Sequence, residues 1–303
     1  MPRVSILLPV FNAARFLPRA LASIFAQTER DFELIAVNDG STDRSLAILE
    51  RHARCDPRLR VFSQANTGII GALNKGLTHC TAPWVARMDA DDWCAPARLE
   101  KQLHYLEASP ECVALGTWTM FTDPEGRILK QYRPPTTHAE IEAELCNCNG
   151  GALIHPSCIF ARAAIEAVGG YRGKSPSPED VDLYIRLLDR GRLANLPEAL
   201  YYYRLHFGSI THQAGDWNAL VVELTRDLRA RHGLAPFLVE GSAGPPLSRS
   251  DFRRRWALYA AEGGNLSSAW PNIAHALLRE PWNRENFSVL NYLFHLSRRA
   301  GTR

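Results

Sequence analysis

The chain has 303 residues, of which 46% are hydrophobic and 22% are charged, and its formal net charge is +3. This composition is typical of a globular protein, and no apolar run approaches the roughly eighteen residues that a membrane span requires. So small a net charge gives no reason to expect nucleic acid as a partner. The length favours one large α/β domain with an appendage.

Cysteine usage and the first residues bear on the compartment. The seven cysteines are an odd number and lack the paired spacing of a zinc site, so we expect free thiols in a reducing environment. The chain enters its first strand without the basic leader and apolar core of a signal peptide, and we expect a cytoplasmic protein.

Strands and helices alternate through the first ninety residues. The runs VSILLPV and FELIAV are apolar apart from one polar residue each, as in strands buried on both faces, and shorter strands are expected at Arg60–Phe62 and from Trp84. Between them, apolar residues at helical spacing predict three helices, which carry Leu17 and Leu21, Leu46 and Leu49, and Leu73 and Leu77. This alternation predicts parallel strands joined by right-handed crossovers.

Polar residues follow each of these four strands. The clusters are Pro9 to Asn12, Asp39, Asn66 to Gly68 and Asp89 to Asp92. Because ligands of parallel sheets bind beyond the carboxyl ends of the strands, the four clusters are expected at one edge. After the second strand, Gly40 permits a tight turn and Ser41 or Thr42 is expected to cap the next helix.

Three carboxylates, those of Asp89, Asp91 and Asp92, lie in the stretch WVARMDADDW. Carboxylates this close repel one another unless a cation lies among them, and oxygen-only ligation suits Mg²⁺ or Mn²⁺ shared with a phosphate. The alternative is a solvated turn before a helix, where aspartate is common. Neither a G-x-G-x-x-G after the first strand nor a G-x-x-x-x-G-K-[ST] occurs, so the familiar nucleotide motifs are not supported.

The second half of the chain contains one further acidic stretch, SPEDVD, before an apolar-periodic helix. By itself it reads as a helix start, with Ser177 at the N-cap and Pro178 at the first helical position. His155, in an HPS stretch, is expected to be a hydrogen-bonded core histidine. Four amphipathic helices are predicted at about Asp216 to His232, Asp251 to Glu262, Leu266 to Leu278 and Arg284 to Arg299, with a loop at Val239 to Pro246.

Four ordered stretches resemble the nucleotide-sugar half of family-2 glycosyltransferases. They are VSILLPVFNAARFLPRAL, IAVNDGSTD, QANTGIIGALNKGL and RMDADDW, and the resemblance covers about residues 1–210. It implies an α/β GT-A fold with a mostly parallel nucleotide-binding sheet flanked by helices, and the four amphipathic helices predicted beyond it are expected to form a C-terminal helical extension. The expected domains are 1–215, with a nucleotide-sugar half at 1–95 and an acceptor half at 96–215, and the extension at 216–303.

The resemblance also implies roles for individual residues. The nucleoside would be held by the first three polar clusters, at Pro9, Phe11, Asn12, Asp39, Asn66 and Gly68. Asp89 would lie near the ribose, and Asp91 would bind a Mn²⁺ or Mg²⁺ ion that bridges the diphosphate.

In the second half, the resemblance implies that Asp180 is the general base, with Glu179 beside it in the donor site. The stretch YRLHFGSIT resembles the closing motif of the family. Arg204 would then be a phosphate partner, and His206 would lie near the diphosphate or the metal.

These roles predict an inverting, metal-dependent transferase that moves a sugar from a nucleoside-diphosphate sugar, expected to be UDP-linked, to a hydroxyl of a saccharide or lipid-linked acceptor in surface polysaccharide synthesis. One alternative is a sugar-nucleotide-forming nucleotidyltransferase, although PVFNAARF lacks the glycine-rich loop of such enzymes. Another is a non-catalytic sugar- or partner-binding protein. The late tryptophans and arginines leave open a packed helical cap, peripheral contact with the inner face of a membrane, and a homo-oligomer.

Overall fold

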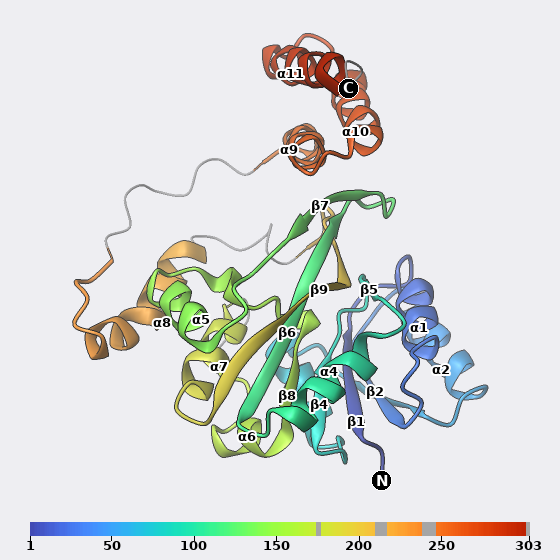
Figure 1. Ribbon diagram of the computed structural model, residues 1–303. Helices are drawn as coiled ribbons and strands as arrows, with labels where there is room; N and C mark the ends of the chain where they lie inside the picture. Colours follow the sequence, from blue (N-terminus) through green and yellow to red (C-terminus); the bar gives the residue numbers. More distant parts are fainter. Residues whose placement is uncertain (174–176, 210–216, 238–246, 301–303) are drawn as a thin grey trace. The chain divides into compact units, whose positions relative to one another are not determined.

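The computed structural model describes residues 1–173, 177–209, 217–237 and 247–300 (Figure 1). The chain forms two compact units, each treated by itself below. The first comprises Met1–Thr119, Arg133–Tyr201 and Ala214–Gly241, and the second comprises Met120–Tyr132, Tyr202–Gln213 and Ser242–Arg303. Helix α8 (Trp217–Arg231) belongs to the first unit, where it packs against α5 (His138–Cys146) and α7 (Glu179–Leu187). The division into domains at residue 215 stays a prediction.

A parallel sheet forms the N-terminal part of the first unit, as predicted. Its strands are β1 (Val4–Val10), β2 (Phe32–Asp39), β3 (Leu59–Gln64) and β4 (Trp84–Arg87), in the order β3-β2-β1-β4. Every residue of β1 and β2 is buried, which explains why these strands are largely apolar, and the buried Ser5 hydroxyl donates a hydrogen bond to Glu33 on the neighbouring strand. The register pairs Val10 with Asn38 and Asp39 with Gln64, so the carboxyl ends of these strands lie level.

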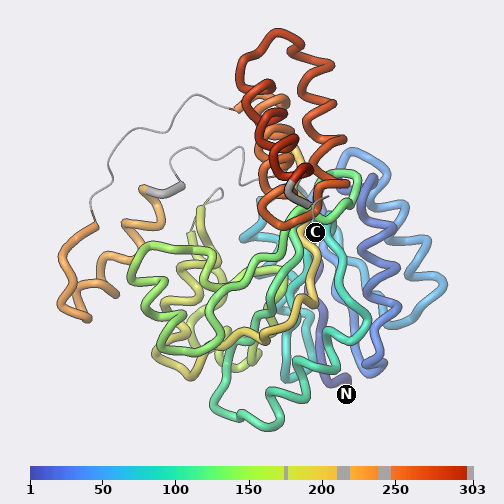
Figure 2. Tube along the Cα trace, turned by 45° about the horizontal axis from the view of Figure 1, so that its top comes forward, coloured from blue at the N-terminus to red at the C-terminus, as the bar shows by residue number. Residues whose placement is uncertain are grey.

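The crossover helices are α1 (Leu17–Phe25), α2 (Ser45–Ala53) and α3 (Gly68–Leu77). Figures 1 and 2 show α1 and α2 side by side along the same flank of the strands. The prediction that Ser41 or Thr42 caps α2 is wrong. Its N-cap is Arg44 without a side-chain hydrogen bond, because the Ser41 hydroxyl accepts the Asn12 N–H instead.

Beyond β4 the sheet becomes mixed and continues β8-β6-β9-β5, with β4 and β6 both antiparallel to β8. These strands are β5 (Trp93–Cys94), β6 (Cys112–Thr122), β8 (Ile159–Ala161) and β9 (Arg192–Arg204). The remaining helices of this region are α4 (Arg98–Ala108) and α6 (Arg162–Ala167), with 3₁₀ turns at Gly150–Ala152 and His155–Ser157. Helix α7 begins one residue after its N-cap, which is Pro178 rather than the expected Ser177.

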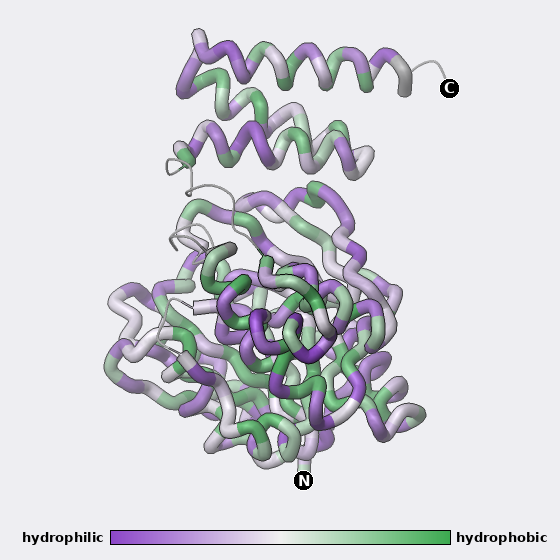
Figure 3. The backbone as a smooth tube through the Cα atoms, turned by 90° about the vertical axis from the view of Figure 1, so that its left-hand side faces the viewer, coloured by the Kyte–Doolittle hydropathy of each residue, from purple (hydrophilic) through white to green (hydrophobic). Residues whose placement is uncertain are grey.

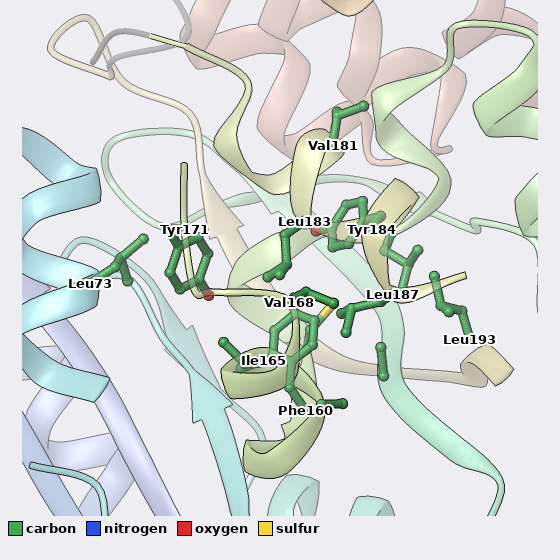
Figure 4. Close-up of a cluster of buried hydrophobic side chains, with 14 of the residues drawn as sticks. Leu73, Phe160, Ile165, Val168, Tyr171, Val181, Leu183, Tyr184, Leu187 and Leu193 are labelled. Carbon is green, nitrogen blue, oxygen red and sulfur yellow. The ribbon is translucent and has the colours of Figure 1, made fainter. Parts of the chain in front are cut away.

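A hydrophobic cluster fills the space between the mixed strands and the helices α6 and α7. Figure 4 shows its members, among them Phe160, Ile165, Leu183 and Leu187. His155 is 5% exposed at the edge of this cluster, and its Nε2 lies 2.9 Å from the Tyr171 hydroxyl. The prediction of a core histidine is therefore confirmed. All seven cysteines are free, also as predicted.

The second unit combines a β-hairpin with three helices. Strand β7 (Ile128–Tyr132) pairs with β6, and the helices are α9 (Arg249–Glu262), α10 (Leu266–Arg279) and α11 (Arg284–Ala300), close to the predicted ranges. Hydrophobic and hydrophilic residues alternate along α11 in Figure 3. The predicted loop at Val239–Pro246 lies outside the described residues. Within the described ranges, no helix has the length and apolar character needed to cross a bilayer.

Candidate active site

The first polar cluster, which follows β1, is hydrogen-bonded to the loop after β2. Asn12 adopts a left-handed conformation with φ of 49°, in which its Oδ1 accepts the Thr42 N–H at 2.8 Å. The Ala13 and Ala14 N–H groups donate to Ser45 Oγ and Asp43 Oδ2, each at 2.9 Å. The fold therefore brings these two loops together as predicted, and Phe11, directly after β1, is 52% exposed.

Asp39 joins the second cluster to the third. Its Oδ1 accepts hydrogen bonds from Gln64 Nε2, Thr67 N and Thr67 Oγ1, and its Oδ2 accepts one from Gly68 N at 2.9 Å. The carboxylate is 3% exposed and lies at the N-terminus of α3, where the helix dipole favours a negative charge. Oδ1 thus already accepts three hydrogen bonds whereas Oδ2 accepts one, so further acceptor capacity remains mainly at Oδ2.

Gly40 and Gly68 are the two glycines that this junction requires. Both have positive φ, 73° and 80°, which a side chain would strain. A Cβ atom on Gly40 would also lie 2.8 Å from the backbone nitrogen of Asn66. Asn66 and Gly68 are thus placed next to Asp39 and its loop, as the pattern of clusters predicted.

Asp89, Asp91 and Asp92 form an acidic cluster directly after β4. One carboxylate oxygen from each lies within 4.8 Å of the others. Asp92 is 1% exposed, whereas Asp89 and Asp91 are only partly buried. Three carboxylates at this spacing fit a hard divalent cation such as Mg²⁺ or Mn²⁺, because such ions prefer oxygen ligands and offset the mutual repulsion.

Two buried groups that the sequence reasoning missed surround this acidic cluster. Arg87, 4% exposed at the end of β4, forms an ion pair with Asp89. Tyr201 on β9 donates its hydroxyl hydrogen to Asp92 Oδ2 at 2.9 Å and accepts the Asp89 N–H at 3.2 Å. Burial and the nearby charges of Asp92 and Asp89 raise the pKa of Tyr201 well above its usual range, so the phenol keeps its proton.

Glu179 and Asp180 open helix α7 with partly buried carboxyl groups. Burial, followed by the charge of Asp180, raises the pKa of Glu179 to about 8. Burial also raises the pKa of Asp180, although its Oδ1 accepts a hydrogen bond from the Val181 N–H, which acts to lower this pKa. The charges of Arg87 and Asp89 act on both carboxyl groups, which puts this pair in the same electrostatic environment as the acidic cluster.

Arg204 and His206 belong to the second unit. Arg204 is 4% exposed, and its Nη1 donates to the carbonyl of Pro124 in the β6–β7 turn at 2.9 Å. His206 Nδ1 accepts the Gly208 N–H at 3.2 Å. Their implied roles at the phosphate and metal stay predictions.

A weak signal for Arg87 was present in the sequence, because a charged residue inside the apolar run WVAR needs a partner once buried. No comparable signal marked Tyr201. It lies in a run of three tyrosines, and which of them points at the aspartates depends on the pairing of β9 in the sheet.

Comparison with known proteins gives a consistent set of relatives. Residues 5–169 match the family described as Glycosyl transferase family 2. An uncharacterised glycosyltransferase of Haemophilus influenzae is 34% identical over 216 residues, which cover 68% of this chain and 66% of that protein. The amylovoran biosynthesis glycosyltransferase AmsE of Erwinia amylovora is 32% identical over 73% of this chain and 82% of its own length.

Solved structures show the same fold. TarS 1–349 of S. aureus, in complex with UDP-GlcNAc, superposes with a TM-score of 0.62 at 20% identity over 88% of this chain and 72% of its own. The mannosyltransferase PcManGT of Pyrobaculum calidifontis, in complex with GDP-Man and Mn²⁺, gives a TM-score of 0.56 at 19% identity over 98% and 86%. The predicted GT-A fold is confirmed. Since the family match spans more than half of its residues, the chain belongs to glycosyl transferase family 2.

Proposed function

We propose that the protein transfers a sugar, with inversion, from a nucleoside-diphosphate sugar to a hydroxyl group of a saccharide or lipid-linked acceptor. The observation that carries this proposal is that the acidic cluster after β4 and the Glu179–Asp180 pair share one electrostatic environment around Arg87. Relatives named for amylovoran and O-antigen biosynthesis support a surface polysaccharide as the product. The family membership disfavours the nucleotidyltransferase alternative.

In this proposal Asp180 is the general base. The acceptor oxygen attacks the anomeric carbon, its proton passes to the Asp180 carboxylate, and the bond from that carbon to the diphosphate breaks with both electrons leaving on the nucleotide. A single displacement of this kind inverts the anomeric centre. The raised pKa of Asp180 supports the role, because a more basic carboxylate takes up the proton more readily.

Asp89, Asp91 and Asp92 would hold the divalent cation, with Mn²⁺ or Mg²⁺ as candidates. When bound, such an ion neutralises the charge that builds on the departing diphosphate. The nucleoside would lie on Phe11 and the hydrogen-bonded loops that follow β1 and β2, with the Oδ2 atom of Asp39 turned to a base N–H or a ribose hydroxyl. UDP is our proposed nucleotide. Arg204 and His206 keep their proposed contacts with phosphate and metal.

We also propose that the α10–α11 turn contacts an anionic membrane surface, where lipid-linked acceptors lie. Leu278, in the last turn of α10, and Trp282, between α10 and α11, are 82% and 88% exposed, and tryptophan favours the membrane interface. Arg279 directly follows Leu278 and Arg284 lies two residues after Trp282, whereas the Glu280 carboxylate pairs with Arg254 Nη1 at 3.1 Å. Two apolar side chains beside two cations complement a negatively charged lipid surface.

The membrane proposal is tested with vesicles. The full chain should sediment with vesicles that contain phosphatidylglycerol, and the Leu278→Ser, Trp282→Ser double variant should stay largely in the supernatant. Binding that is equal for both proteins would refute the proposal. Concentration-dependent dimerisation that the double variant abolishes, without vesicle binding, would assign the turn to a second copy of the chain instead.

The transferase proposal is tested by nucleotide binding and UDP release across a panel of UDP-sugars with Mn²⁺. Asp91→Ala should abolish metal-dependent donor binding. Asp180→Asn should keep that binding but lose slow donor hydrolysis and transfer, because the amide cannot take up a proton. Glu166→Gln, a surface change, is the matched control and should behave as the unsubstituted protein. If no nucleotide sugar binds with or without metal, the transferase proposal fails, and the alternative of a non-catalytic sugar- or partner-binding protein replaces it.

A further inference from the structure

Tyr201 contacts the acidic cluster at two points at once. Its hydroxyl donates to Asp92 Oδ2 at 2.9 Å and accepts the backbone N–H of Asp89 at 3.2 Å. A single oxygen atom therefore joins the side chain of one acidic residue to the backbone of another. Both Tyr201 and Asp92 are buried, at 0% and 1% exposure, so water does not compete for these hydrogen bonds.

The ring of Tyr201 is itself held in place. The Arg98 guanidinium lies 5.1 Å from the ring centroid, and Arg98 Nη2 donates to the carbonyl of Arg87 at 2.9 Å. Next to Tyr201, the Leu200 carbonyl accepts the Ala95 N–H at 2.9 Å. Arg98, 1% exposed, thus connects the end of β4 with the tyrosine that contacts the loop after β4.

We propose that Tyr201 is a positioning residue for the divalent-cation site. Its hydroxyl fixes the orientation of Asp92 and the path of the Asp89 backbone, so that the three carboxylates are held close together before the cation arrives. The inference rests on the proposed metal-dependent transfer. It adds a residue from β9, 109 positions after Asp92, to a carboxylate cluster otherwise drawn from one short loop.

The physical reason is the repulsion among three carboxylates. Without a fixed frame they would separate in the cation-free protein, and bringing them together again would reduce the affinity for the ion. Groups that orient metal ligands typically contribute 10- to 100-fold to affinity. We therefore expect Tyr201→Phe, which keeps the ring over Arg98, to weaken Mn²⁺ binding by roughly tenfold or more.

The test measures Mn²⁺ affinity directly, by the loss of the free Mn²⁺ signal in electron paramagnetic resonance, on the full chain without nucleotide. Tyr171→Phe is the matched control, because it also removes one hydrogen bond of a buried tyrosine, here to His155, without touching the acidic cluster. Thermal unfolding of both variants shows whether they lose similar stability. Tyr201→Phe should lose Mn²⁺ affinity, whereas Tyr171→Phe should keep it.

A second background tests whether the loss of Mn²⁺ affinity acts through Asp92. Asp92→Ala removes the carboxylate that accepts the hydroxyl hydrogen and leaves only the contact with the Asp89 N–H, so in this background Tyr201→Phe should cost less Mn²⁺ affinity than in the unsubstituted protein. Equal affinity in the unsubstituted protein and Tyr201→Phe would overturn the inference, as would the same tenfold loss in both backgrounds. Failure of the unsubstituted protein to bind Mn²⁺ would instead overturn the proposed metal site, and this inference with it.

Discussion

Replacing Asp39 by asparagine probes the junction on which the nucleoside pocket is built. The carboxylate accepts hydrogen bonds through both oxygens, from Gln64 and Thr67 on Oδ1 and from the Gly68 N–H on Oδ2. An amide offers only one oxygen, so its NH₂ group must face at least one of these donors. The least costly orientation leaves the Gly68 N–H without an acceptor at the start of α3.

The magnitude follows from two losses. A buried N–H that loses its acceptor costs about 1–3 kcal/mol, and the lost negative charge at a helix N-terminus costs a further ~0.5–1 kcal/mol. Asp39→Asn should therefore destabilise the protein by about 2–4 kcal/mol, which corresponds to a fall in Tm of roughly 4–10 °C for a chain of this size. It should also weaken UDP binding, because the Asn66–Gly68 loop shifts.

Differential scanning fluorimetry and isothermal titration with UDP measure both effects. Asp56→Asn is the control, since Asp56 pairs with Arg58 at the surface and such pairs contribute under about 1 kcal/mol. A Tm for Asp39→Asn within about 1 °C of the control would refute the structural role deduced for this carboxylate.

Three further outcomes are expected. Burial raises the pKa of Glu33, but hydrogen bonds from Ser5, Thr81 and Arg60 outweigh burial and lower this pKa below its usual value. The stability that the carboxylate contributes is therefore present above about pH 4.5 and lost as the pH falls through the lowered value. Glu33→Gln should destabilise the protein by about 1 kcal/mol at pH 7 and by progressively less as the pH falls below 4.5 in urea titrations. The stability contribution of Glu179 depends on pH with the opposite sign, because the folded protein holds the carboxyl proton up to about pH 8 whereas the unfolded chain releases it near pH 4.5. Without metal, Glu179→Gln should therefore raise Tm by an amount that grows progressively between pH 5 and pH 9. A difference in Tm that stays constant over this range would contradict the prediction. In the second unit, Arg253→Met should remove the paired hydrogen bonds to Glu125 at 2.9 Å and the bond to Asn272; hydrogen exchange should then lose protection in α9 and the β6–β7 turn but not in β1 or β2.

Much of the fold could be predicted from the sequence because local patterns dictate it. β1 was predicted at its full observed extent, since Val4–Val10 is buried on both faces and is therefore apolar at every position but Ser5. The helices α1, α3 and α9 to α11 followed from apolar spacing in the same way. The convergence of four polar clusters followed from the level carboxyl ends of parallel strands.

Capping at α2 was mispredicted for a reason that the local sequence does not contain. Ser41 and Thr42 are good capping residues, but Asn12, thirty positions earlier, takes up their hydrogen-bonding groups in the folded chain. A local rule cannot anticipate a partner that the crossover of the chain brings into reach.

The sequence by itself determined the order of strands and helices, the position of the acidic cluster and the family, because all of these are written in contiguous stretches. Only the tertiary structure decided how the acidic cluster is supported. The pairing of β9 in the mixed sheet turns Tyr201 toward Asp92, and the end of β4 buries Arg87 beside Asp89. Both depend on strand register and packing between distant segments, which set the direction of a side chain and which no local pattern encodes.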